Sequence, residues 1–97
     1  MPSVLISDPR SPLGFAVAAR FQEGGWFVIG CDSGTYPGRQ TTVHICADTS
    51  RPDAAVAAAE KAVEAGNGLD FVIDLDPASM LGDASVPYVG SAERVVF

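Results

Sequence analysis

The feature that most constrains the fold of this chain is the alternation of uninterrupted apolar runs with helical segments. Apolar runs rich in β-branched residues lie at 4–6, 26–31, 41–47 and 69–75. Runs without polar alternation are typical of strands that are buried on both faces of a sheet. A helical segment follows the first run, and another follows the third. Strands and helices that alternate in this way predict an α/β domain with a parallel sheet.

Two segments carry the start, stop and spacing signals of helices. In the first, Ser11 is expected to cap the helix, Pro12 to occupy its first position and Gly24 to end it. The apolar stripe of this helix is expected to consist of Leu13, Val17 and Phe21. In the second segment, Ser50 is expected to be the cap and Gly66 the stop. The stripe of the second helix is expected to consist of Val56, Ala59 and Val63.

Right-handed crossovers predict a sheet with the strand order 3-2-1-4 and one main helix on each face. Residues 32–40 link the second and third strands without a helix, and this link is shorter than the roughly dozen residues of a usual parallel crossover. Residues 76–92 are expected to be mostly loop, with a helical turn near Met80, and 94–97 to form a short fifth strand. The chain as a whole, 1–97, is expected to be a single domain.

Charge and composition exclude several classes of partner. The net charge is -6 and the six Lys and Arg residues are scattered, so nucleic acid is not an expected partner. No apolar run reaches the roughly 18 residues of a membrane span, and a signal-peptide pattern is not seen. We therefore expect a cytoplasmic protein. Cys31 and Cys46 are expected to be reduced, buried thiols, with a disulfide or a metal pair as the alternative.

The segment from 3 to 77 resembles the N-terminal half of the short-chain dehydrogenases/reductases. Their pattern is a strand, Thr-Gly-x-x-x-Gly-x-Gly, a helix, a second strand and an acidic residue; here it reads VLI, SDPRSPLG, FAVAARFQEGG, WFVIGC and Asp32. The segment 47–49 resembles the Asp-Val segment that lies beside the adenine in that family, and 68–73 resembles the entry into its fourth strand. The resemblance implies a three-layer Rossmann-like fold, with NAD as the cofactor if any is bound.

The resemblance also implies a set of cofactor-binding positions: Ser7, Arg10, Leu13, Gly14, Asp32, Asp48 and Thr49. Two of the three family glycines are replaced, by Asp8 and Pro12, and Gly14 keeps only the packing role of the third. The carboxylate of Asp8 would repel a diphosphate by about 4 kcal/mol per charge pair at about 4 Å, and Pro12 removes an N–H donor. Asp32 is expected either to accept the ribose hydroxyls or to begin the loop at Ser33.

The residues that perform proton transfer in the family have no counterpart in this sequence. The segment 88–92 resembles the family's Tyr-x-x-Ser-Lys but has Ala92 where lysine is required, and the favoured alternative is that Tyr88 is a loop tyrosine that matches by coincidence. Lys61, the only lysine, lies on a predicted helix. The lysine lowers the pKa of the tyrosine so that it can act as acid or base. We therefore assign no catalytic residue and expect a protein without this enzymatic activity.

Aspartates at the ends of predicted strands allow a different interpretation. Asp8, Asp74 and Asp76 are expected at the same edge of the sheet, where they could hold Mg²⁺ or Ca²⁺. The alternative is that they are solvated turn residues. The single histidine, His44, is expected to be a structural side chain of the third strand rather than a ligand or base.

The leading hypothesis is a non-catalytic Rossmann-like module that acts in binding or assembly. The alternatives are an NAD(P)-linked oxidoreductase or nucleotide-binding subunit completed by a partner chain, and a domain that binds a divalent cation. Two helices cannot cover both faces of such a sheet, and 95–97 is apolar. We therefore expect a homodimer or a larger protein partner to cover an exposed sheet face and the C-terminal segment.

Overall fold

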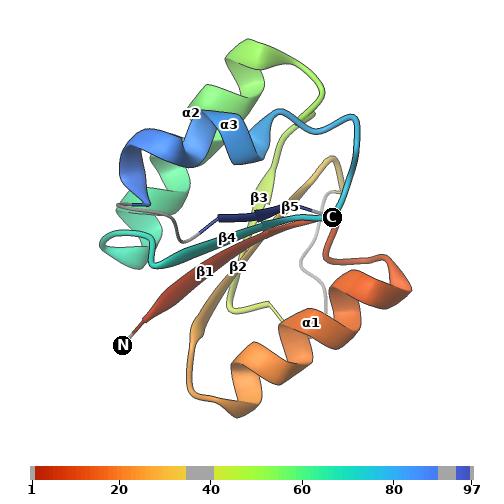
Figure 1. The fold of residues 1–97 in the computed structure, drawn as a ribbon, viewed down its shortest axis with the longest axis vertical. Helices are drawn as coiled ribbons and strands as arrows, with labels where there is room; N and C mark the ends of the chain where they lie inside the picture. Colours follow the sequence, from red (N-terminus) through yellow and green to blue (C-terminus); the bar gives the residue numbers. More distant parts are fainter. Residues whose placement is uncertain (1, 35–40, 90–93, 97) are drawn as a thin grey trace.

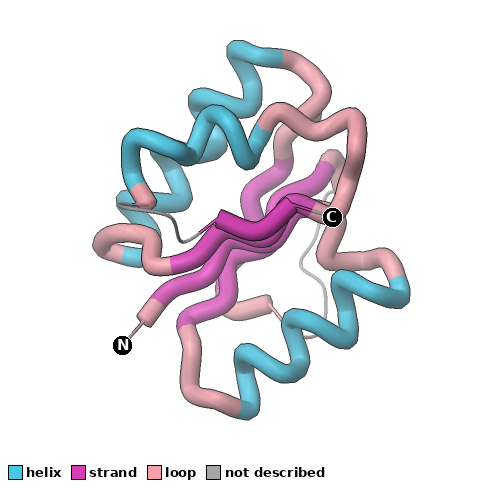
Figure 2. The backbone as a smooth tube through the Cα atoms, viewed as in Figure 1, coloured by secondary structure: helices cyan, strands magenta, loops and turns pink. Residues whose placement is uncertain are grey.

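The computed structural model describes residues 2–34, 41–89 and 94–96. Its elements are β1 Ser3–Ser7, α1 Pro12–Glu23, β2 Phe27–Asp32, β3 Val43–Cys46, α2 Pro52–Gly66, β4 Phe71–Asp74, α3 Leu81–Ser85, the 3₁₀ turn η1 Val86–Tyr88 and β5 Arg94–Val96. The strands form one parallel sheet in the order β3-β2-β1-β4-β5. Helix α1 covers one face, and α2 and α3 cover the other (Figure 1; Figure 2). The predicted three-layer fold, its strand order and the fifth strand are confirmed.

Each face of the central strands contributes to its own core. Leu5 pairs in register with Ile29 on β2 and Val72 on β4, and none of these three side chains is exposed. They pack beneath α2 and α3. The neighbours of Leu5 on β1, Val4 and Ile6, point to the opposite face and pack with α1. Both faces of β1 are thus buried, which is why its sequence is apolar without alternation.

Helix α1 begins as predicted, and Val17 and Phe21 of its predicted stripe pack against the core, but Leu13 does not. The Ser11 hydroxyl accepts a hydrogen bond from the Gly14 N–H at 3.0 Å, as an N-cap should. Leu13, predicted to lie on the buried stripe, is 54% exposed, so that assignment is wrong. Gly14 and Ala18 are buried instead. Gly14 can lie this close to the β1–α1 turn because it has no Cβ, which would collide with the carbonyl oxygen of Asp8.

Helix α2 differs from its prediction at the cap and at one residue of the buried stripe, whereas Ala59 and Val63 pack into the core as predicted. Its N-cap is Arg51, which makes no side-chain capping bond, rather than Ser50. Val56, predicted to be buried, is 46% exposed. The buried face consists of Ala55, Ala58, Ala59 and Ala62. Alanine lets the helix axis lie close to the sheet, so the smallest apolar side chains rather than the largest define the contact.

The expected bare face of the sheet is not found on β1 to β4. Large apolar side chains exposed in the described ranges lie on helices and turns: Leu13, Phe15, Val56, Met80, Val86 and Tyr88. Part of the reason is α3, which begins directly after Met80 and packs against β4 and β5. The two cysteines are free, but Cys46 is exposed, so the expectation of two buried thiols holds only for Cys31. Within the described residues, we find no helix long and apolar enough to cross a membrane.

A candidate site at the carboxyl edge of the sheet

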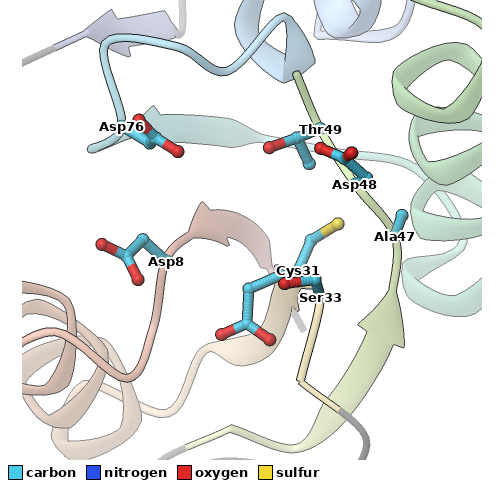
Figure 3. Close-up of a pocket in the computed structure, with 8 residues that line it drawn as sticks. Asp8, Cys31, Ser33, Ala47, Asp48, Thr49 and Asp76 are labelled. Carbon is cyan, nitrogen blue, oxygen red and sulfur yellow. The ribbon is translucent and has the colours of Figure 1, made fainter. Parts of the chain in front are cut away.

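A pocket of about 140 Å³ lies where β1, β2 and β4 end and where the chain leaves β3. It is lined by Asp8, Cys31, Asp32, Ser33, Ala47, Asp48, Thr49 and Asp76. In Figure 3, Asp8 and Asp76 lie on one side of the pocket, and Asp48 and Thr49 lie on the other. This is the edge at which open parallel sheets bind their ligands. The volume is below the about 300 Å³ at which small-molecule pockets usually begin.

The turn between β1 and α1 is tied down by its own backbone. Asp8 has a left-handed backbone, with φ 51°, where glycine would be the unstrained choice. Its N–H donates to the Cys31 carbonyl at 3.1 Å. Its carbonyl accepts from the Ser11 N–H at 3.3 Å and from the Ser11 hydroxyl at 3.0 Å. The turn is therefore closed tightly enough to need glycine at Gly14, as predicted.

The first turn of α1 has few N–H groups left for an anion. Pro12 has no N–H, and the Gly14 N–H is taken by the Ser11 hydroxyl. The Phe15 N–H donates to the Ser11 carbonyl at 2.8 Å. Among the first three helical positions, the backbone N–H that is left for an anion is that of Leu13, whose side chain is exposed. A helix N-terminus binds phosphate through several free N–H groups, and here the capping bonds consume most of them.

Asp32 is held by three neighbours at the end of β2. Its Oδ1 accepts the Gly34 N–H at 2.8 Å and lies 3.3 Å from Nε2 of His44. Its Oδ2 lies 3.2 Å from Nε of Arg10. The bond to Gly34 is the turn-initiating role that the sequence left as one of two alternatives. Asp32 also lines the pocket, so the geometry keeps the other alternative, a ribose acceptor, open.

Across the pocket, residues after β3 and β4 contribute carboxylates and one buried threonine. Asp48 is exposed, and its Oδ1 accepts from the N–H of Ser50 at 3.1 Å and from its hydroxyl at 2.6 Å. These hydrogen bonds lower the pKa of the Asp48 carboxyl, so it stays charged. Thr49 is buried, and its carbonyl accepts the Met80 N–H at 2.7 Å. Asp76 accepts the Ala78 N–H at 2.9 Å.

The three aspartates that the sequence offered as a metal site do not form one. Asp74 is only 3% exposed, and Oδ1 accepts the Ser7 hydroxyl at 2.7 Å while Oδ2 accepts the Gly82 N–H at 3.0 Å. Asp8 and Asp76 line the pocket, and Asp74 does not. Among the described residues no group of three or more His, Cys, Asp or Glu side chains could hold a metal ion. Ser7 does not line the pocket either. Its hydroxyl donates to Asp74 and accepts the Leu75 N–H at 2.8 Å.

Three pocket residues were missed from the sequence: Cys31, Ser33 and Ala47. Their positions beside Asp32 and Asp48 could have indicated them, because residues that adjoin these two aspartates in the sequence lie at the same edge of the sheet. Burial raises the pKa of the Cys31 thiol to about 12, with a smaller contribution from the Asp32 carboxylate. The thiol is therefore neutral and a poor nucleophile at ordinary pH.

Two further expectations concern side chains away from the pocket. The side chain of His44 is 5% exposed, and its Nε2 lies 2.9 Å from the Gly34 carbonyl, which agrees with a structural role. Tyr88 lies in η1 and is 37% exposed. Residues 90–92 of the segment that resembles the family's catalytic tyrosine motif lie outside the described residues.

Comparisons with known proteins support the fold. A C-terminal deletion mutant of the aldohexose dehydrogenase from Thermoplasma acidophilum matches with a TM-score of 0.81 at 16% identity, over 98% of this chain and 47% of the enzyme. A short-chain dehydrogenase from Burkholderia cenocepacia in complex with NADP matches with a TM-score of 0.77 at 17% identity, over 97% and 53%. A 3-ketoacyl-(acyl-carrier-protein) reductase from Brucella melitensis complexed with NADH matches with a TM-score of 0.70 at 24% identity, over 77% and 34%.

These likenesses establish a shared Rossmann-like fold with short-chain dehydrogenases/reductases. The chain spans between about a third and about half of the length of these structures. The sequence matches no protein-family model and has no significant similarity to a curated protein.

Proposed function

We propose that this chain is a non-catalytic Rossmann-like module that does not bind a dinucleotide and acts through binding or assembly. The observation that carries the proposal is the first turn of α1. Pro12 has no N–H, the Ser11 N–H donates to the Asp8 carbonyl, and the Gly14 N–H donates to the Ser11 hydroxyl. A diphosphate placed there would meet one remaining N–H, on Leu13, rather than the row of donors that a helix N-terminus offers.

The charge around the pocket supports the same conclusion. Four carboxylates line it: Asp8, Asp32, Asp48 and Asp76. Arg10 is paired with Asp32, and Arg51 acts on Asp48 while it also pairs with Asp53, so the lining of the pocket stays predominantly negative. Carboxylates within about 4–6 Å of a phosphate oppose its binding. The absence of catalysis is supported by Ala92, which stands where the resemblance requires lysine.

A second candidate is a nucleotide-binding subunit that a partner chain completes. It is favoured by the pocket, which brings together Asp32, Asp48 and Thr49, three positions that the resemblance assigns to the nucleoside. Two of the three structures described above contain NADH or NADP. A residual site of this kind would bind the sugar and base more strongly than the phosphates.

Calorimetric titration of the chain with NADH, NAD, ATP and Mg²⁺ tests both candidates. The proposal predicts no saturable heat with NADH, NAD or ATP. Low-micromolar affinity for NADH would overturn the proposal and favour the second candidate. A response to Mg²⁺ alone would favour neither and would revive the cation-binding alternative.

Assembly is the part of the proposal that a mass measurement tests. Exposed apolar side chains on α3 and its flanking turns, Met80, Val86 and Tyr88, support a contact with a second copy or a larger partner. Sedimentation velocity at micromolar concentration is expected to give a dimer. A monomer at all accessible concentrations would remove self-assembly from the proposal.

A further inference from the structure

Another pocket lies at the opposite edge of the sheet, where α1 ends and β2 begins (Figure 1). Its volume is about 250 Å³, and it is lined by Arg20, Phe21 and Trp26. Helix α1 runs back from the carboxyl edge, so its last turn leads into the amino end of β2, where Phe27 pairs in register with Ser3. This pocket and the acidic pocket share no lining residue and lie at opposite ends of the strands.

A cluster of three aromatic rings stands at this pocket. The rings of Phe21 and Trp26 meet edge to face, with centroids 4.9 Å apart. The ring of Phe71 on β4 lies 5.9 Å from that of Phe21 and 6.3 Å from that of Trp26. The Trp26 backbone N–H also donates to the Phe21 carbonyl at 3.0 Å, which ties the turn to the helix end. Because all three side chains are only partly buried, the cluster is a preformed aromatic surface rather than a closed core.

The polar groups of this pocket are donors that lack protein acceptors. In the described part of the chain, no ion pair is found for Arg20 and no hydrogen bond for the indole N–H of Trp26. Arg10 and Arg51, by contrast, each pair with an aspartate. A guanidinium can bind a carboxylate through two parallel N–H···O bonds. The pocket therefore offers one unpaired cation beside aromatic surface.

We propose that this pocket binds a small aromatic monocarboxylate, whose ring packs on Phe21 and Trp26 and whose carboxylate pairs with Arg20. A ring is favoured because aromatic pairs gain more than the area they bury. A single negative charge is favoured because Arg20 is the only charged residue lining the pocket in the described ranges, and the net charge of -6 opposes a ligand with more. The volume is just below the about 300 Å³ at which small-molecule pockets usually begin, so one ring with a short chain is the expected size. This site is independent of the proposed function, whose evidence lies at the other edge of the sheet.

The test is a fluorescence titration, because Trp26 is the only tryptophan of the chain and its emission reports on this pocket. The unaltered chain is expected to give a saturable change with 3-phenylpropanoate, with a dissociation constant in the millimolar range or below. 3-Phenylpropanamide has the same ring without the charge and should bind at least about threefold more weakly, which is the scale of an exposed ion pair. Acetate has the charge without the ring and should give no saturable change.

The variant Arg20→Gln should bind 3-phenylpropanoate only as weakly as the amide and should leave the affinity for the amide unchanged. Arg51→Gln is the matched control, since it removes an exposed ion pair with Asp53 on α2 and should change neither affinity. If Arg20 serves only to complement the carbonyl end of α1, Arg20→Gln lowers stability and leaves both affinities as they were, which overturns the proposal. Equal affinity of the unaltered chain for acid and amide, or no saturation at tens of millimolar, also overturns it. The comparison of acid with amide needs no variant, so it decides the matter even if Arg20→Gln does not fold.

Discussion

Asp74 and Asp8 lie at the carboxyl ends of neighbouring parallel strands, yet the fold uses them in opposite ways. Asp74 is buried, and both of its oxygens accept hydrogen bonds, from β1 and from α3. Asp8 has an open side chain that faces a pocket, and its backbone is left-handed. One carboxylate therefore holds three elements together, and the other places a negative charge at the pocket. An acidic residue after a strand is not by itself evidence for either role.

The largest expected effect is the loss of Asp74. Asp74→Ala should lower the free energy of unfolding by about 3–5 kcal/mol, because a hydrogen bond to a charged group contributes about 1.5–3 kcal/mol and the buried Ser7 hydroxyl and Gly82 N–H would lose their acceptor. Urea denaturation followed by circular dichroism measures this. Asp76→Ala is the control and should cost less than about 1 kcal/mol. Equal costs for the two variants would mean that the buried hydrogen bonds of Asp74 do not hold the three elements together.

The next effect concerns the turn that contains Asp8. Gly14→Ala should destabilise the chain by about 1–3 kcal/mol, although alanine is the better helix former, because its Cβ would collide with the Asp8 carbonyl. Thermal unfolding checks the sign. An increase in stability would mean that the turn is looser than the described geometry and that its donors are not fixed.

Cys31 on β2 is buried, and Cys46 on the adjacent strand β3 is exposed, so the two thiols should affect stability differently as the pH rises. The pKa of Cys31 is about 12 in the folded chain, against 9.0 for the ordinary thiol. The unfolded thiol therefore ionises first, and the stability from this group, complete below pH 9, should fall by about 1.4 kcal/mol per pH unit between 9 and 12. Cys31→Ser should flatten this slope, and Cys46→Ser should not.

Alkylation gives an independent check on the same pair. Iodoacetamide should modify Cys46 in the native chain and Cys31 only after denaturation. Modification of Cys31 at a comparable rate would show that the pocket opens more readily than its burial indicates.

The smallest effect is expected at Asp8 itself. Asp8→Gly should stabilise the chain by about 0.5–1 kcal/mol, because glycine adopts a positive φ without steric cost. The measurement is again urea denaturation, with Asp53→Gly in the first turn of α2 as a control that should destabilise. A loss of stability in Asp8→Gly would mean that its carboxylate makes a contact that matters to folding.

The sequence predicted the sheet because strands buried on both faces have a distinctive apolar run, as in β1 and β2. It predicted the cap at Ser11 because capping depends on a local pattern, a serine directly before a helical segment. It predicted only part of each buried helix face: Ala59 and Val63 pack as expected, but Ala55 and Ala58 were missed because alanine has little hydrophobicity of its own and packs through proximity to the sheet. The metal site failed because the orientation of Asp74 depends on Ser7, 67 residues away.

We propose that the turn after β1 preserves the fold but does not form a dinucleotide site. The most direct test is a calorimetric titration of NADH into the unaltered chain and into Asp8→Gly/Pro12→Gly, which removes one carboxylate and restores one N–H. We predict saturable binding by the double variant, and none by the unaltered chain at concentrations up to about ten times the dissociation constant of that variant, a difference of at least about 1.4 kcal/mol. Equal affinity in the two, or low-micromolar binding by the unaltered chain, would contradict the claim.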